Sequence, residues 1–171
     1  MSIRTLLAIL AIGIVGAAGP IAAADEDEAN PAAVAKHLQS AKVTLQQGLT
    51  AAESQGQPIS GKFEVDEGHF QLSVYTAKGG KFSEVLVDHV TGKVVKSEAI
   101  TGGDDLFAAK KQMAALAKAK KPLKSAVDQA EQASAGYRAV SVTPKLSNGH
   151  AVAVVTLLKG TETKSASESL E

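Results

Sequence analysis

Residues 44–98 contain the pattern that most constrains the fold, because a short amphipathic helix is followed by the alternation of antiparallel strands. Thr44 and Gln47 have the spacing of a capping box, in which each side chain satisfies a free backbone N–H at the start of a helix. Leu45 and Leu49 lie on one face of this helix. We therefore expect that face to pack against the strands that follow.

Four runs of alternating apolar and polar residues come next, and they predict strands with one buried face. They cover residues 59–67, 70–76, 84–88 and 94–95. Glycine is present in each connection between them, as tight hairpins require. Four antiparallel strands with the helix on their apolar face is the simplest arrangement.

The C-terminal half repeats this order of elements after a linker at residues 101–104. Helices are expected over residues 106–118 and 123–135, and strands around Val142 and Val154. The tail, residues 163–171, is polar and rich in Ser, which is a poor strand signal.

An internal repeat relates the two halves. Leu45 and Leu49 match Leu123 and Val127 at a separation of 78 residues. Further on, the separation is 81, because Gly68-His69 matches Gly149-His150 and Gly79 matches Gly160. The sequence thus predicts a helix and a meander that occur twice.

The first copy resembles the PepSY domain family of small exported bacterial modules. The matching segments are the helix Leu45-x-x-x-Leu49-x-x-Ala52-Glu53, the strand Phe70-Gln71-Leu72-Ser73-Val74, and the hairpin Glu84-Val85-Leu86-Val87-Asp88-x-x-Thr91-Gly92-Lys93-Val94. The second copy lacks the Asp-x-x-Thr-Gly signature and is degenerate. The resemblance implies an α+β, cystatin-like fold, and inhibition or control of a peptidase without a catalytic site.

The sequence therefore predicts that the chain is divided into three parts. A signal peptide covers residues 1–24, a first PepSY-like unit covers residues 30–100, and a second, degenerate unit covers residues 105–171. Each unit has one or two helices packed on an antiparallel meander.

The N-terminus has the composition of a secretory signal. Arg4 supplies positive charge, residues 6–15 form an apolar core, and residues 22–24 are the small side chains that a signal peptidase needs. We predict cleavage after Ala24 and a periplasmic or secreted mature protein. The alternative is an uncleaved membrane anchor, since the uncharged run is just long enough to span a bilayer.

The composition of the chain argues against several classes of function. Equal numbers of basic and acidic residues, 18 of each, give no basic face for nucleic acid. The absence of Cys excludes disulfides, thiol nucleophiles and zinc sites built on Cys. No sequence motif of a serine hydrolase or zinc peptidase is present, so we expect no enzyme activity, catalytic residue or cofactor.

A few polar residues have two readings. Asp88 is expected to stabilise its turn by accepting backbone N–H bonds. With His69 and His89 it could instead offer ligands to a metal, but solvated histidines are the favoured reading and no metal residue is assigned. Four lysines attract an acidic partner or lipid surface, or simply face solvent at a helix break. They are Lys118, Lys120, Lys121 and Lys124.

Two functions from different classes follow. The leading hypothesis is an exported, non-enzymatic module that binds a protein partner, such as a peptidase, through a sheet face or edge. The alternative is a periplasmic carrier of a small ligand or metal ion, which would use a cavity between helix and sheet. The sequence leaves the oligomeric state open.

Overall fold

The computed structural model describes residues 31–171. The predicted signal peptide and its cleavage site after Ala24 lie outside these residues. Within them, the chain is an α+β structure with four α-helices and one antiparallel sheet of seven strands. The predicted α+β class is therefore confirmed.

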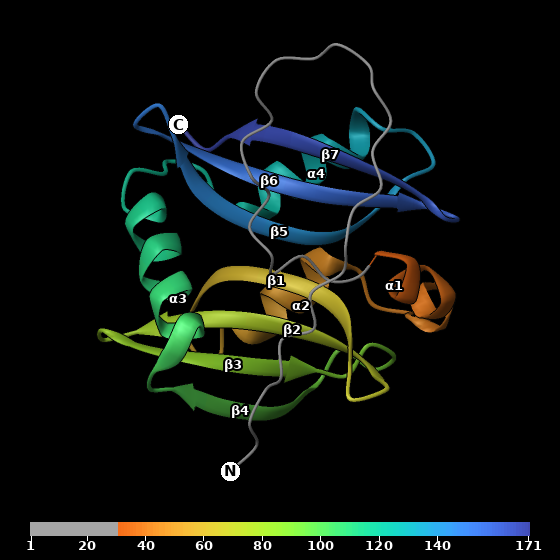
Figure 1. Cartoon of the computed structure of the whole chain (residues 1–171), viewed down its shortest axis with the longest axis horizontal. Helices are drawn as coiled ribbons and strands as arrows, with labels where there is room; N and C mark the ends of the chain where they lie inside the picture. The colour runs from red at the N-terminus through yellow and green to blue at the C-terminus, as the bar shows by residue number, and fades with distance from the viewer. Residues whose placement is uncertain (1–30) are drawn as a thin grey trace, which may run out of the picture.

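Helices and strands follow one another in two groups (Figure 1). The first group is α1 (Pro31–His37), the short 3-10 helix η1 (Leu38–Ser40), α2 (Leu45–Ala52), β1 (Gln57–Asp66), β2 (His69–Lys78), β3 (Lys81–Val87) and β4 (Val94–Ile100). The second is α3 (Gly103–Leu116), α4 (Leu123–Gln132), β5 (Arg138–Ser147), β6 (His150–Lys159) and β7 (Glu162–Ser169).

A single sheet contains both meanders, in the order β4-β3-β2-β1-β5-β6-β7 (Figure 1). The meanders meet where β1 pairs with β5, and this junction is short. Its register joins Gly61 to Val142 and Lys62 to Ser141. Strands β4 and β7 lie at the two outer edges of the sheet.

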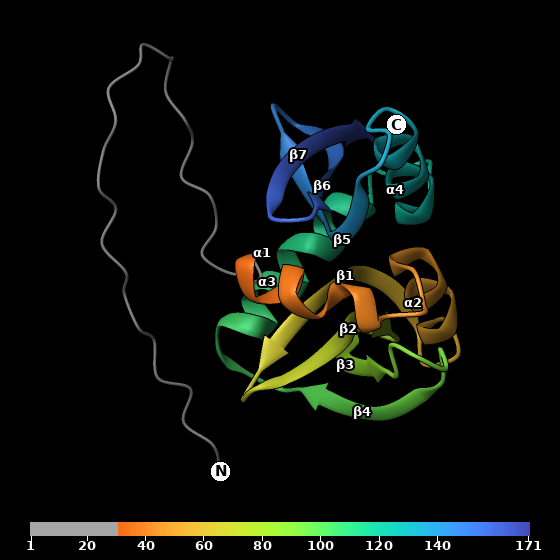
Figure 2. The same cartoon turned by 90° about the vertical axis from the view of Figure 1, so that its right-hand side faces the viewer.

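Helices cover both faces of the sheet (Figure 2). α2 and α4 lie side by side on one face, and α3 crosses the other face over β1 and β5. The backbone of Gly61 is turned toward Leu45 and Leu49 of α2. Ser60, the next residue, donates a 2.8 Å hydrogen bond to Gln112 of α3 on the opposite face.

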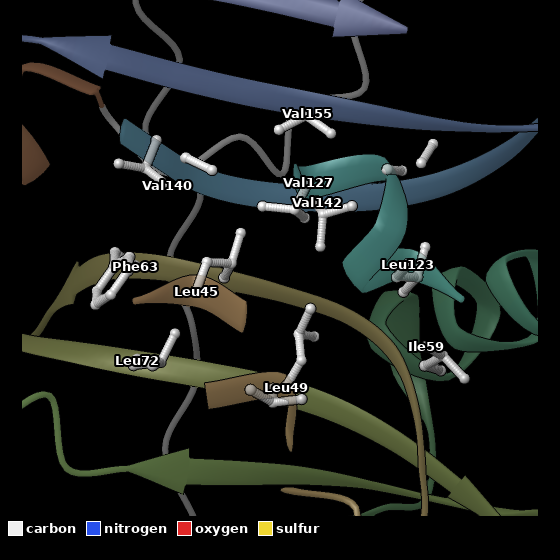
Figure 3. Close-up of a cluster of buried hydrophobic side chains, with 14 of the residues drawn as sticks. Leu45, Leu49, Ile59, Phe63, Leu72, Leu123, Val127, Val140, Val142 and Val155 are labelled. Carbon is white, nitrogen blue, oxygen red and sulfur yellow. The ribbon is translucent and has the colours of Figure 1, made fainter. Parts of the chain in front are cut away.

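The core under α2 and α4 is continuous (Figure 3). Leu45 and Phe63 from the first half, and Val127 and Val142 from the second, are fully buried in it. These side chains pack together between the helices and the sheet.

Local sequence signals account for most element boundaries. The capping box at the start of α2 is confirmed, since Thr44 Oγ1 accepts from the Gln47 N–H at 3.2 Å and Gln47 Oε1 accepts from the Thr44 N–H at 2.8 Å. Glu67-Gly68 and Asn148-Gly149 both have positive φ angles, as two-residue hairpin turns require.

Matching strands have the same register at a separation of 81 residues. Asp66 pairs with His69, and Ser147 with His150. The register of β1 against β2 shifts between Pro58 and Ser60, and that of β5 against β6 shifts between Ala139 and Ser141. Even the local irregularity of the first strand thus recurs in the second meander.

The tail is the main departure from the sequence expectation. Residues 162–169 form the full-length strand β7, although their polar composition argued against a strand. Leu170 after it is completely buried, and its carbonyl accepts hydrogen bonds from Lys120 N at 2.6 Å and Lys121 N at 2.9 Å. This apolar anchor holds the tail against the start of α4.

Smaller boundary errors occur at the helices. The linker expected at residues 101–104 is shorter, because β4 ends at Ile100 and α3 already begins at Gly103. α3 and α4 end before the predicted residues 118 and 135. Their cap residues are Gly102 and Pro122, neither of which makes a side-chain cap hydrogen bond.

Candidate functional site

Asp88 stabilises the β3–β4 turn through one oxygen of its carboxylate. Its Oδ1 accepts from the Val90 N–H at 3.1 Å, the Thr91 N–H at 2.6 Å and the Thr91 hydroxyl at 2.8 Å. Its backbone carbonyl accepts from the Gly92 N–H at 2.8 Å. The hydrogen bonds from Thr91 hold the pKa of Asp88 below its usual value. The predicted turn role is confirmed.

The histidines take separate structural positions. His69 and His150 open β2 and β6, and His150 Nδ1 lies 3.0 Å from Glu171 Oε2. The His89 ring meets the Phe70 ring edge-on at 5.0 Å. Across residues 31–171, no group of three or more His, Asp or Glu side chains is arranged to hold a metal ion.

A polar network covers the sheet face opposite α2, and the sequence did not single it out. Glu64 on β1 is its centre, since its carboxylate lies 2.9 Å from the Lys62 ammonium and accepts from Ser73 Oγ at 2.6 Å and Gln71 Nε2 at 3.3 Å. Burial tends to raise the pKa of Glu64, but Lys62 and these hydrogen bonds outweigh burial and lower it. A carboxylate held in the ionised form is poorly suited to act as a general acid.

The lysine cluster predicted at the α3–α4 connection is divided. Lys120, Lys121 and Lys124 line a depression of about 470 Å³ beside α2, together with Glu53 and apolar side chains such as Leu123. Lys118 does not line it, and its ammonium donates to the Gly149 carbonyl at 2.9 Å. An anionic group is the ligand that such a lysine-rich rim would favour.

Arg138, which the sequence analysis missed, connects the two halves of the chain. Its guanidinium donates to the carbonyls of Leu38 at 3.0 Å, Ala41 at 3.2 Å and Val43 at 2.6 Å, just before α2. It also lies over the Phe63 ring, 5.4 Å from the centroid. No local pattern identifies such a residue, because its partners are far away in the sequence. The three carbonyls lie 95 to 100 positions before Arg138, and Phe63 also lies more than 70 positions before it.

The two edge strands, β4 and β7, consist mostly of exposed residues. The five central residues of β4 are exposed, and Val95 has 65% of its surface exposed. The register of β4 against β3 shifts near Val87, and Lys96 forms a 3.0 Å ion pair with Glu98. Strand β7 pairs with β6 over its full length without a register shift.

Comparisons with known proteins give no relative for this chain, because it matches no protein-family model, no curated protein and no solved structure. The likeness to PepSY modules therefore rests on the residues quoted above. In the described residues, 31–171, no helix is both long and apolar enough to cross a membrane.

Proposed function

We propose that the chain is an exported, non-enzymatic PepSY-type module that binds a protein partner in the periplasm or outside the cell. It consists of two tandem units, residues 30–100 and 105–171, of which the second is degenerate. A peptidase is the partner that the family resemblance favours, and binding would inhibit or regulate it.

The recurrence of backbone detail supports the tandem arrangement. Register, strand irregularity and turn geometry all repeat at a separation of 81 residues. The anchoring bonds repeat as well, since the His89 carbonyl accepts from Lys42 N and Val43 N just as the Leu170 carbonyl accepts from Lys120 N and Lys121 N. Two unrelated folds would have no reason to share these local solutions.

The single observation that carries the binding proposal is the open outer edge of β4. Within residues 31–171 no strand pairs with this edge, and its exposed Val95 provides an apolar contact beside free backbone groups. Strand addition at such an edge gives affinity through main-chain hydrogen bonds. The register shift and the charged pair Lys96–Glu98 discourage indiscriminate pairing, so a partner has to match them.

A proline variant tests this edge. Because the β2–β3 hairpin has the two-residue turn Gly79-Gly80, alternate residues of β3 form backbone hydrogen bonds to β2 and to β4. Ser97 lies opposite a residue of β3 that bonds to β2, so the N–H of Ser97 points outward, away from β3. Ser97→Pro should remove one outward donor without breaking the β3–β4 ladder. Mature wild-type chain should capture a specific envelope protein from extract and alter secreted peptidase activity, and Ser97→Pro should do neither.

The matched control is Ser165→Pro on β7, which makes the same chemical change at the other edge. It should leave capture unchanged. Equal capture by Ser97→Pro and wild type, or no captured protein above background with no effect on peptidases, would reject the binding role of β4.

The lysine-lined depression supports a second candidate, a carrier of a small anionic ligand. Lys120, Lys121 and Lys124 line it together with Glu53 and the apolar side chain of Leu123. Native mass spectrometry of protein purified from its own envelope should then show a defined added mass. That mass should disappear in a Lys120→Ala/Lys121→Ala/Lys124→Ala variant.

A further inference from the structure

We infer that two copies of this chain pair through their β7 strands, antiparallel, with Ala166 at the two-fold axis, so that one continuous sheet runs through both copies. This goes beyond the proposed partner binding, which uses the opposite edge. The inference rests on the exposed edge of β7, its regular register and the order of its charges.

The first step is the place that β7 takes in the sheet. Lys78 pairs with Lys81 at the start of β3, and Lys159 pairs with Glu162 at the start of β7, again at a separation of 81. β7 is therefore the counterpart of β3. The edge of β3 is covered by β4, whereas within residues 31–171 no strand pairs with the same edge of β7.

The second step is the direction of the backbone groups. Gly160-Thr161 forms a two-residue turn, so Glu162 and every second residue after it bond toward β6. The N–H and C=O groups of Thr163, Ser165, Ser167 and Ser169 consequently point outward. Because β7 has no register shift, these groups are aligned for pairing with a regular strand, apart from the Ser169 carbonyl, which accepts from Lys121 Nζ at 3.4 Å.

The third step is the choice of register. With Ala166 on the axis, Lys164 of each copy lies directly opposite Glu168 of the other, and Ser165 lies opposite Ser167. Opposite charges and hydroxyl pairs are favourable cross-strand neighbours. A shift of one step places Glu162 opposite Glu168, and the opposite shift places Lys164 opposite Leu170, so neither alternative forms the charge pairs.

Lys164 is able to take part without losing its present contact. Its ammonium donates to Ser134 Oγ at 2.8 Å within its own copy, and a lysine has three N–H donors. The two charge pairs are equivalent by symmetry, as an isologous two-fold interface requires. β4 is less suited to self-pairing, because its register shift interrupts a regular ladder.

Charge reversal tests the register. The molar mass of the mature chain should be measured by light scattering across a concentration series, where we expect a dimer. Lys164→Glu and Glu168→Lys should each weaken dimerisation about tenfold or more, because each puts like charges opposite one another twice. The double variant Lys164→Glu/Glu168→Lys should restore the dimer.

Edge variants locate the interface. Ser165→Pro should give a monomer, and Ser97→Pro on β4 should remain a dimer, with thermal melts checking that all variants are folded. A monomeric wild-type chain, dissociation by Ser97→Pro in place of Ser165→Pro, or failure of the double charge variant to recover would each overturn the inference. If the folded Ser165→Pro monomer still captures the partner, the proposed partner binding does not depend on dimerisation.

Discussion

Asp88 concentrates three hydrogen bonds on one carboxylate oxygen, and its removal is the most direct test of the β3–β4 turn. Asp88→Ala should lower the melting temperature by about 2–4 °C, because the N–H groups of Val90 and Thr91 lose their acceptor. Asp88→Asn keeps an acceptor oxygen and should lose less. A melting curve unchanged in Asp88→Ala, with partner binding lost, would reassign the residue to function.

Glu64 is a second single residue with a measurable effect, because its lowered pKa should make the stability of the fold depend on pH. Folding lowers its pKa below the ordinary value of 4.5, so the folded state binds the proton less readily than the unfolded state. The stabilisation is therefore present above pH 4.5 and is lost as the pH falls through the lowered pKa. The difference in free energy of unfolding between wild type and Glu64→Gln should shrink on acidification from pH 7 to about pH 3. Urea titrations at several pH values measure it, and a difference independent of pH would contradict the prediction.

At the scale of elements, Arg138 fixes β5 to the segment that leads into α2. Arg138→Ala leaves the carbonyls of Leu38, Ala41 and Val43 without this donor and should cost about 1–3 kcal/mol of unfolding free energy. Arg138→Lys keeps the charge but not the planar fork, so it should recover only part of that loss. Full recovery by lysine, seen in denaturant unfolding, would mean that the charge alone matters.

Elements were predictable where the signal is local. The Thr44–Gln47 capping box, the Asp88 turn and the glycine-containing hairpins each depend on residues within a few positions of one another. Strand β7 was not predictable in this way. Its hydroxyl-rich residues become a strand because they pair with the buried strand β6, and because Leu170 is anchored by the backbone of Lys120 and Lys121.

At the scale of the whole molecule, the sequence suggested two meanders but not their union in one sheet. The β1–β5 junction joins Gly61 to Val142 and Lys62 to Ser141, far apart in the chain, and period-two alternation does not specify which strands become neighbours. The proposed binding edge could not be located from the sequence either. The edge strands can be identified only once the strand order is known. The polar network around Glu64 likewise forms only because β1 and β2 are neighbours in the sheet.

The shared sheet and core predict that both halves unfold together. Val127 of α4 is fully buried in a cluster that also contains Leu45 and Phe63 of the first half. Val127→Ala should cost about 2 kcal/mol and speed hydrogen exchange of the slowest amides about thirtyfold, in β2 as much as in β6. The matched control is Val95→Ala, the same change at a side chain that is 65% exposed, which should leave both strands unaffected. Acceleration confined to β5, β6 and β7 would mean that the units unfold independently despite their common sheet.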